Sequence, residues 1–340
     1  MDRVVTFGEL MLRLAPPGYQ RFLQSPAFEA TFGGGEANVA VSLAKFGVPA
    51  AFITKLPANP IGDAAVGELA RHGVDTAGIV RGGQRVGIYY CEKGASQRAS
   101  KVVYDRKGSA IAEAARSDFR WPALFAGARW FHFTGITPAL SESAAAATLD
   151  ACQAARAAGL TVSCDLNYRK NLWTTAQAQN AMTELMPFVD VLIANEEDAE
   201  KVFGIRAQNT DVASGQLGHR GYVDVARQLT ERFGFKAVAI TLRTSRSASD
   251  NGWAGLLYEN GAAHFSREYD VHIVDRVGGG DSFCAGLIFA RLEGQAPAAA
   301  VEFATAASCL KHSIEGDFNL ATLDEVRALV AGDGSGRVQR

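Results

Sequence analysis

Short apolar runs rich in β-branched residues alternate with longer stretches rich in alanine, leucine and glutamate along most of the chain. The short runs are typical of buried strands and the longer stretches of helices, so their alternation predicts β–α units around a mostly parallel sheet. The predicted strands are Val4–Glu9, Ala50–Leu56, Arg129–Thr134, Leu160–Leu166, Val189–Ala194 and Lys236–Leu242. The predicted helices are Glu36–Phe46, Ile61–His72, Ser141–Ala158, Thr175–Met186, Glu196–Phe203 and Tyr222–Phe233.

The last third of the chain has a different pattern. Two strands, Gly255–Glu259 and Ala263–Tyr269, flank the dipeptide Asn260-Gly261, which is typical of a two-residue hairpin turn. A polar, glycine-rich tail at residues 332–340 is expected to be disordered. Three further helices are predicted before that tail, at Asp281–Leu292, Pro297–Lys311 and Leu323–Val330.

Two segments depart from the β–α rhythm. Residues 11–32 contain Pro16-Pro17-Gly18 and little periodicity, and residues 87–110 contain two strand-like pieces, GIYYCEKG and SKVVYDR, around a polar turn. We interpret both as insertions that form a small β-rich lid over the edge of the sheet. Long excursions inside a compact domain are usually functional or disordered. The aromatic content of the second segment favours function.

Composition and charge narrow the function classes. The 340 residues include 34 Lys and Arg against 36 Asp and Glu, a net charge of −2, which favours neither nucleic acid nor an anionic membrane as a partner. Any bound anion must therefore be met by local groups. Apolar runs such as Val238–Leu242 are far shorter than the ~20 residues that span a bilayer, and the N-terminus has no basic leader. We expect a soluble protein.

The cysteines and histidines provide no metal or hydrolase site. The odd number of cysteines without CxxC spacing argues against a disulfide framework and a zinc site and favours a reducing cytoplasm. The histidines lack ligand spacing, and no G-x-S-x-G elbow is present, so a metal-dependent lyase and a Ser-His-Asp hydrolase are poor candidates. The cysteines are Cys91, Cys152, Cys164, Cys284 and Cys309.

The segment FGGGEANVAVSLAKFG, residues 32–47, places three glycines before a helical pattern. Such glycines let the backbone approach a ligand closely, and Asn38 would project a donor and an acceptor near the first helical turn. A glycine turn followed by a helix cap is the other interpretation. A dinucleotide fingerprint is excluded because the glycines do not follow the first strand in a GxGxxG arrangement.

The segment DRVGGGDSF, residues 275–283, places three glycines directly before an aspartate and a helix. Consecutive N–H groups of Gly278, Gly279 and Gly280 would form an anion-binding nest, reinforced by the helix N-terminus. Asp281 could be a helix residue favoured by the dipole. Beside a nest it could instead accept the proton of a hydroxyl that attacks a phosphoryl group.

The two glycine segments together resemble the PfkB (ribokinase-like) carbohydrate kinase family, through GG-x-x-x-N-x-A at the first and D-x-x-GxGD at the second. The resemblance covers residues 3–331. It implies a single domain over residues 1–331, an α/β fold with a doubly wound, mostly parallel sheet flanked by helices, and a β-rich lid. It implies ATP and Mg²⁺ as cofactors, with a monovalent cation such as K⁺ near the GGGD loop as a further expectation. Asp281 would be the base, and Gly278 to Gly280 the anion hole.

The substrate is indicated by VVYDRKGSA, residues 102–110, and by DLNYR, residues 165–169, which are similar to the 2-keto-3-deoxygluconate kinase branch of the family. A keto acid needs cations for its carboxylate, and Arg106 and Arg169 carry the planar forks that suit a carboxylate or the transferred phosphoryl, which also makes Arg169 a catalytic candidate. Each arginine could instead be a solvated charge, and each tyrosine part of the lid packing. The resemblance places these residues around the substrate: Gly34, Asn38, Tyr89, Tyr104, Arg106, Asn167, Arg169, Asp281 and Asp317.

The metal and nucleotide motifs depart from the family pattern. Where the family has N-x-x-E, this chain has Asn195 and Asp198, one methylene shorter, and we expect these two side chains to organise Mg²⁺ through water. The family's K-x-G-x-x-G is replaced by TLRTSRS. The residues expected at the nucleotide are Asn167, Asn195, Leu242, Arg243, Ser245, Gly278 and Gly280.

We therefore expect ATP-dependent phosphorylation of the terminal hydroxyl of 2-keto-3-deoxygluconate by a cytoplasmic homo-oligomer, a dimer or an assembly of dimers. Alternative substrates within the family are 2-keto-3-deoxygalactonate, fructose, ribose and a nucleoside. A sugar-acid-binding regulator without catalysis is the alternative from another class.

Overall fold

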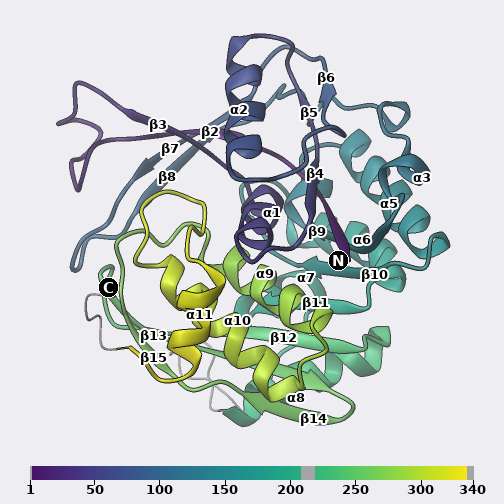
Figure 1. The fold of residues 1–340 in the computed structure, drawn as a ribbon, viewed down its shortest axis with the longest axis vertical. Helices are drawn as coiled ribbons and strands as arrows, with labels where there is room; N and C mark the ends of the chain where they lie inside the picture. The colour runs from purple at the N-terminus through teal and green to yellow at the C-terminus, as the bar shows by residue number, and fades with distance from the viewer. Residues whose placement is uncertain (1, 208–218, 335–340) are drawn as a thin grey trace.

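A nine-stranded sheet forms the centre of the computed structural model, which describes residues 2–207 and 219–334 (Figure 1). Six strands run parallel in the order β4, β1, β9, β10, β11, β12, so the mostly parallel sheet is confirmed. Antiparallel β13 follows β12, and β14 and β15 both pair with β13. The strands are β1 (Arg3–Phe7), β4 (Ala50–Ile53), β9 (Ala128–Thr134), β10 (Thr161–Asp165), β11 (Val191–Asn195), β12 (Ala237–Ser245), β13 (Asp250–Glu259), β14 (Ala262–Phe265) and β15 (Tyr269–His272).

Helices cover both faces of this sheet because its strands are apolar on both sides. In β12, Val238 and Ile240 belong to one buried cluster while Ala237 and Ala239 belong to another, as the two-residue repeat of a strand requires. The first cluster includes side chains of α5 (Glu142–Ala157), α6 (Thr175–Leu185), α7 (Glu196–Phe203) and α8 (His219–Phe233). The second includes side chains of α1 (Gly35–Lys45), α2 (Pro60–Arg71), α9 (Gly279–Leu292), α10 (Pro297–Lys311) and α11 (Leu323–Val330).

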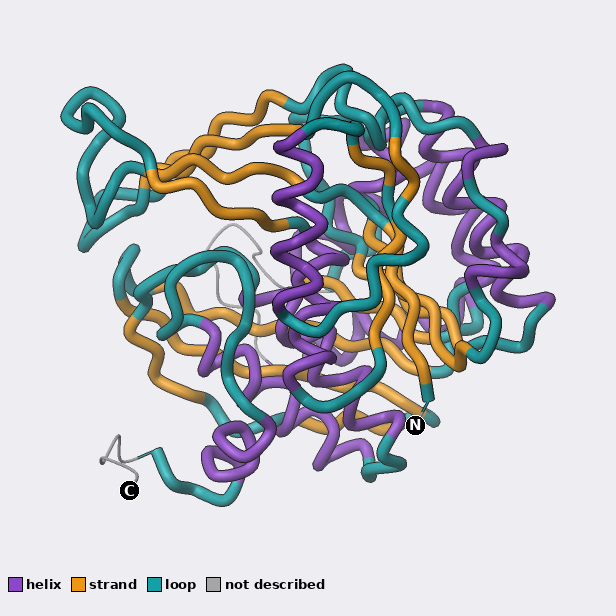
Figure 2. The backbone as a smooth tube through the Cα atoms, turned by 45° about the horizontal axis from the view of Figure 1, so that its top comes forward, coloured by secondary structure: helices purple, strands orange, loops and turns teal. Residues whose placement is uncertain are grey.

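The two segments interpreted as a lid form a separate four-stranded sheet in the order β3, β2, β7, β8, which we call the lid sheet. It extends away from the body at the upper left of Figure 1, and Figure 2 shows its strands side by side from a second direction. Its buried residues include Tyr89, and Val277 of the body packs against them. The strands are β2 (Met11–Ala15), β3 (Glu29–Gly33), β7 (Gly87–Glu92) and β8 (Lys101–Asp105).

The sequence pattern misplaced several strand ends. The strand predicted to end at Leu242 continues to Ser245, and its partner begins at Asp250 rather than at Gly255. Arg243, Thr244 and Ser245 lie in this antiparallel extension, where their side chains are exposed and no apolar pattern is needed. The strand predicted over Ala263–Tyr269 is divided, because the Ser266 hydroxyl accepts the N–H of Gly255 at 2.9 Å and interrupts the ladder.

Shorter elements were not predicted. The strand expected over Ala50–Leu56 leaves the main sheet after Ile53, and β5 (Lys55–Leu56) pairs with β6 (Val80–Arg81) instead. Helices α3 (Trp121–Leu124) and α4 (Ile136–Ala139) and the 3₁₀ turns Arg116–Asp118 and Met186–Phe188 are too short to show a periodicity.

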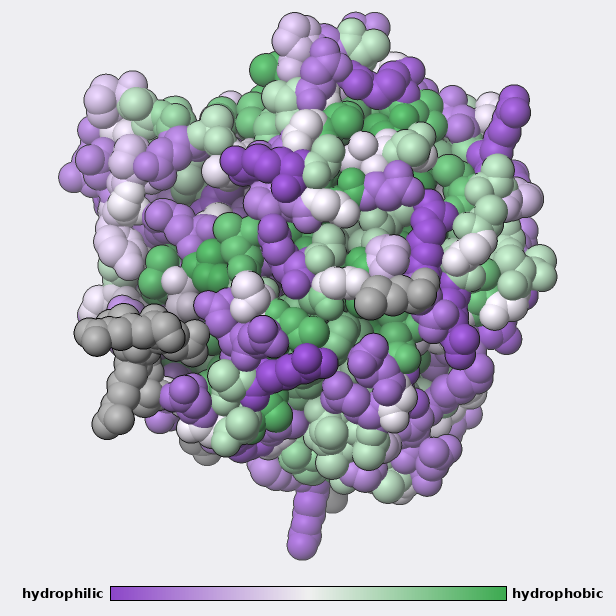
Figure 3. Space-filling view, in the orientation of Figure 1, coloured by the Kyte–Doolittle hydropathy of each residue, from purple (hydrophilic) through white to green (hydrophobic). Residues whose placement is uncertain are grey.

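The outer surface is mixed in polarity. Figure 3 shows hydrophilic residues over much of the visible face, with hydrophobic residues in separate patches. In the part of the chain that the structure describes, no helix combines the length and the apolar character needed to cross a bilayer. Most of the tail that was expected to be disordered, residues 335–340, lies outside the described residues.

Candidate active site

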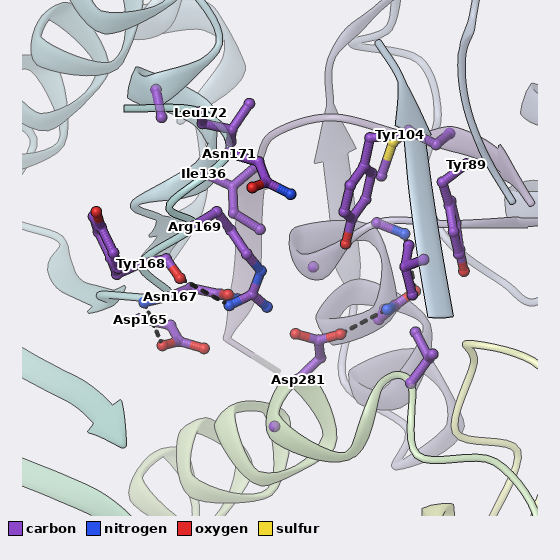
Figure 4. A pocket seen from close by; sticks show the side chains of 18 of the residues that line it. Tyr89, Tyr104, Ile136, Asp165, Asn167, Tyr168, Arg169, Asn171, Leu172 and Asp281 are labelled. Atoms are coloured by element: carbon purple, nitrogen blue, oxygen red, sulfur yellow. Dashed lines mark hydrogen bonds between the residues drawn. The ribbon is translucent and has the colours of Figure 1, made fainter. Parts of the chain in front are cut away.

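A cavity of about 1620 Å³ lies between the lid sheet and the carboxyl ends of the parallel strands (Figure 4). Strand β1 has β4 on one side and β9 on the other, and the crevice at such a switch in strand order is the usual ligand site of an open α/β sheet. The volume exceeds the ~300–1,000 Å³ of a typical small-molecule site and offers room for two substrates. The predicted site residues that line it are Gly34, Asn38, Tyr89, Tyr104, Arg106, Asn167, Arg169, Asn195, Asp198, Arg243, Gly278, Gly280, Asp281 and Asp317.

Asp281 and Asn38 meet at the base of this cavity. The Asn38 Nδ2 donates to the Asp281 Oδ2 at 2.6 Å, and the Asn38 Oδ1 accepts the N–H of Gly34 at 3.2 Å. One asparagine therefore connects the two glycine segments that were singled out in the sequence.

The Asp281 carboxyl is a weaker acid than an ordinary aspartate. Burial raises its pKa to about 7, and the negative charges of Asp317 and Glu36 act in the same direction, whereas the Asn38 hydrogen bond and Arg169 lower it. A general base works best when its pKa lies near the operating pH, so a carboxyl with a pKa near neutrality suits this role.

The three glycines at the start of α9, which we call the glycine loop, are constrained by what lies beneath them: Gly278 caps the helix, and Gly279 and Gly280 are its first residues, two positions before the predicted start at Asp281. Gly278 has a left-handed φ of 86°, and a Cβ there would lie 2.0 Å from the carbonyl oxygen of Asp317. A Cβ on Gly279 would lie 2.6 Å from the His312 ring, whereas one on Gly280 would meet nothing within 4 Å. Gly278 and Gly280 line the cavity, and Gly279 is buried against His312 outside its lining.

Arg169 and the lid tyrosines lie on opposite sides of the space in front of Asp281. Figure 4 shows the Arg169 guanidinium on one side and the Tyr104 hydroxyl on the other. Arg169 Nη1 also donates to the carbonyl of Tyr168 at 3.1 Å, which anchors the side chain beside the cavity. The side chain is thus within the cavity rather than on the outer surface.

Asp165, at the end of β10, is a site residue that the sequence analysis missed. Burial raises its pKa well above the usual range, and the charges of Asp198 and Asp281 add to this effect. Its Oδ1 accepts the N–H of Asn167 at 3.1 Å, which holds Asn167 at a left-handed φ of 38°. The buried Asn167 Oδ1 has no hydrogen-bond partner within the described part of the chain, which is unusual for a buried polar atom.

Asn195 and Asp198 form the cap of α7. The Asn195 Oδ1 accepts the N–H groups of Glu197 and Asp198, while the two Asp198 oxygens accept those of Tyr168 and Asn195. The shorter aspartate is thus held at the helix end. Among residues 2–207 and 219–334, no three His, Cys, Asp or Glu form a cluster that could hold a metal ion. These donors fit a Mg²⁺ held through water and phosphate oxygens, which is the usual manner of that ion.

Arg106 is a buried cation whose N–H groups are only partly used in hydrogen bonds. Its guanidinium lies 4.3 Å from the ring centroid of Tyr104, and Nη1 lies 3.5 Å from Oε2 of the buried Glu9. Neither Nε nor Nη1 makes a hydrogen bond to any described residue. Buried charged donors without acceptors are costly, so this pattern indicates a place for an anionic ligand group.

Asp317 belongs to a buried charge network. It accepts hydrogen bonds from Arg13 at 2.8 Å and from the Tyr89 hydroxyl at 2.6 Å, and Arg13 also donates to Asp275 at 2.6 Å. Its carboxylate lines the cavity as expected, but these partners already occupy it. Arg13 lies in a segment with little periodicity, and no motif marks it in the sequence.

The predicted nucleotide residues only partly converge. Arg243 lines the cavity with Thr241, but Leu242 and Ser245 do not. Alternate residues of β12 face opposite sides, so Leu242 points into the apolar core, and Ser245 lies at the exposed end of the strand. A nucleotide contact of Leu242, through its backbone, and of Ser245 stays a prediction.

Comparisons with known proteins agree with the sequence resemblance. A 2-dehydro-3-deoxygalactonokinase of Haloferax volcanii is 33% identical over 333 residues, covering 98% of each chain. A 2-dehydro-3-deoxygluconokinase of Thermoproteus tenax is 28% identical, covering 93% of this chain and 90% of that protein. The solved structure of a 2-dehydro-3-deoxygluconokinase from Thermotoga maritima is 53% identical, covers 98% of this chain and 100% of its own, and matches with a TM-score of 0.94. Because the model of the family described as pfkB family carbohydrate kinase also matches residues 1–319, the chain belongs to the pfkB family of carbohydrate kinases.

Proposed function

We propose that this kinase transfers the γ-phosphoryl group of ATP to the terminal hydroxyl of 2-keto-3-deoxygluconate. The observation that carries the proposal is the position of Asp281, a carboxyl with a pKa of about 7, beside the Gly278–Gly280 loop and in the cavity that Arg106 and Arg169 line. The names of the relatives support the same substrate class, since two of the three are 2-dehydro-3-deoxygluconokinases.

In the proposed reaction, Asp281 accepts the proton of the attacking hydroxyl. The N–H groups around Gly278 and Gly280 and the N-terminus of α9 stabilise negative charge on the transferred phosphoryl, and Arg169 adds its positive charge. Mg²⁺ bound with ATP would neutralise phosphate charge, with Asn195 and Asp198 holding it through water. Little covalent chemistry is left to the protein, so positioning and electrostatics supply the rate enhancement.

We assign the substrate carboxylate to Arg106. Its guanidinium lines the cavity, where it can donate hydrogen bonds to a carboxylate, and the Tyr104 ring keeps it in place. A neutral sugar such as fructose or ribose would leave these donors unsatisfied. The C4 epimer, 2-keto-3-deoxygalactonate, presents the same carboxylate and is the second candidate substrate, favoured by the 33% identity to the Haloferax enzyme.

We also propose that the chain associates through its lid sheet. The fully exposed Leu23 and the exposed Val103 belong to a set of large hydrophobic residues on the lid segments. Exposed apolar patches of this kind are typical of interfaces. Sedimentation velocity of the wild type and of Val103→Asp would test this proposal, with a dimer expected for the first and a monomer for the second.

An enzyme-linked ADP-release assay tests the proposed function. We expect kcat/KM for 2-keto-3-deoxygluconate to exceed that for fructose, ribose and adenosine by about 100-fold or more, as loss of buried charge partners predicts. Equal rates with neutral sugars would contradict the substrate assignment. Tight binding of the keto acid in calorimetry without any ADP release would instead identify a sugar-acid-binding regulator.

A further inference from the structure

A lysine ammonium is buried directly beneath the glycine loop. Lys311 is the last residue of α10, its exposed fraction is 0%, and its Nζ donates to the carbonyl oxygens of Ile314 at 3.0 Å and Asp275 at 3.4 Å. Asp275 opens the segment that leads into the three glycines. A fully buried lysine is rare unless it is paired or has a function.

The lysine stem also supports the loop sterically. The Cε of Lys311 lies 3.1 Å from the position that a Cβ would take on Gly278, so the side chain fills the space under the first glycine of the nest. Two neighbours on the same helix act beside it: the Ser308 hydroxyl donates to the carbonyl of Gly279 at 2.6 Å, and the His312 ring lies beneath Gly279. The C-terminal end of α10 therefore supports the glycine loop from below.

The oxygen atoms of Asp275 and Asp317, near the end of α10, already have cationic partners. The Asp275 carboxylate accepts Arg13 at 2.6 Å and the N–H groups of Val277 and Gly316, while its carbonyl accepts Lys311. Asp317, the next carboxylate, is held by Arg13 at 2.8 Å. The acceptors that a monovalent cation would need beside the GGGD loop thus face a guanidinium and an ammonium that belong to the chain.

We propose that the Lys311 ammonium takes the place of the monovalent cation that was expected near this loop, so that the kinase needs no added K⁺. An ammonium ion and K⁺ have the same charge and similar size, and both are satisfied by carbonyl oxygens. The positive charge at the C-terminal end of α10 is also favoured by the helix dipole. Lys311 is then a positioning residue, which fixes the direction of the N–H groups of Gly278 and Gly280. The role of Lys311 in turnover rests on the proposed kinase function. The replacement of a bound cation by the Lys311 ammonium does not depend on that function.

The first test compares turnover in tetramethylammonium and potassium buffers of equal ionic strength. For the wild type we expect rates within about two-fold of each other. For Lys311→Ala we expect a loss of about 10²-fold in kcat in tetramethylammonium, the usual effect of disturbing one charge-stabilising group, with recovery of about tenfold on adding K⁺ or NH₄⁺. Lys311→Met fills the same space without charge and should not recover. Lys45→Ala, at the end of a different helix, is the control and should behave as wild type.

The second test does not depend on catalysis. Without substrates, K⁺ or NH₄⁺ should raise the melting midpoint of Lys311→Ala, because the vacated site binds them, and should leave the midpoints of the wild type and Lys45→Ala unchanged. Strong activation of the wild type by K⁺ would overturn the proposal, and so would a Lys311→Ala protein that shows neither defect nor response. If Lys311→Ala does not fold, the wild-type buffer comparison still decides. A wild type that lacks kinase activity altogether would contradict the proposed function, whereas the melting test would still report on the cation.

Discussion

The amide of Asn38 lies 2.6 Å from the carboxylate of Asp281, although 243 positions separate the two residues in the chain. Asn38 is in the first turns of α1 and Asp281 is in the first turn of α9, so the contact places the N-termini of two helices beside each other. Both helix ends favour negative charge in the space between them. In the proposed reaction, the pair defines where the substrate hydroxyl lies when Asp281 accepts its proton.

Replacing Asp281 by asparagine should strongly reduce turnover and leave binding of the sugar acid nearly unchanged. The amide keeps the shape and the Asn38 contact but cannot accept a proton, so we expect kcat to fall by about 10²–10⁴-fold, the usual contribution of a general base. Steady-state kinetics measures this loss, and calorimetry should give a sugar-acid Kd within a few-fold of wild type. Asp324→Asn is the matched control, because Asp324 also lies in the first turn of a helix, α11, but does not line the cavity. If both variants keep full activity, Asp281 serves only the helix dipole.

The pH profile should follow the ionisation of Asp281. Its carboxyl has a pKa of about 7 and acts as the base only when ionised, so kcat/KM should fall about tenfold per pH unit below that value and level off above it. Asn38→Ala removes the hydrogen bond that lowers this pKa, and the acidic limb should then move to higher pH. A limb that stays in place in the variant would argue against Asp281 as the group observed.

The same carboxyl should make stability depend on pH. Its pKa is raised in the folded state, so the folded chain holds a proton that the unfolded chain has lost between about pH 4 and pH 7. The stabilisation is full below pH 4 and is lost as the pH rises to 7. As the pH rises over this range, the free energy of unfolding of Asp281→Asn should therefore increase relative to that of the wild type. The expected gain is a few kcal/mol, because each unit of pKa shift corresponds to about 1.4 kcal/mol. Urea unfolding of both proteins at a series of pH values measures the difference, and parallel curves would contradict the raised pKa.

The fold and the two residues Asn38 and Asp281 were predictable from the sequence for physical reasons. Strands that are covered on both faces need continuous apolar runs, and the crossover helices need an amphipathic face, so the pattern carries the topology. The two glycine segments are visible because close backbone approach excludes side chains. Asp281 directly follows one of these runs of glycines and Asn38 comes shortly after the other, so both stand out in the sequence.

The rest of the site depends on contacts that leave no local pattern. Arg13 and Asp317 are 304 positions apart, and each is a single charged residue in an irregular or turn segment. Lys311 looks like an ordinary basic residue at a helix end until the loop is folded over it. Asp198 was compared with the glutamate of the family motif, and only the structure shows that it completes a helix cap.

Arg106 should discriminate acids from neutral sugars. Arg106→Met keeps an apolar stem against Tyr104 but removes the donors, so KM for the keto acid should rise by about 10- to 100-fold, which corresponds to the ~1.5–3 kcal/mol of a charged hydrogen bond. The weak activity with fructose should hardly change. Arg85→Met is a control, since Arg85 does not line the cavity and forms a partly exposed ion pair with Asp105. An equal loss with acids and neutral sugars would place the role of Arg106 in folding of the lid sheet.

Adjacent glycines in the loop should respond differently to alanine. A Cβ on Gly279 would lie 2.6 Å from the His312 ring, which is itself packed against Trp253, so Gly279→Ala should lower the melting midpoint and the yield of folded protein. A Cβ on Gly280 meets nothing within 4 Å, so Gly280→Ala should melt at or above the wild-type midpoint, as alanine is also the better helix former. In Gly280→Ala the added methyl group borders the cavity beside Asp281. For this variant we therefore expect a higher KM for ATP and little change in the KM for the keto acid. The two melting curves and the two KM values separate the supporting role of Gly279 from the phosphate contact proposed for Gly280, and a Gly280→Ala enzyme with an unchanged ATP KM would remove Gly280 from the anion hole.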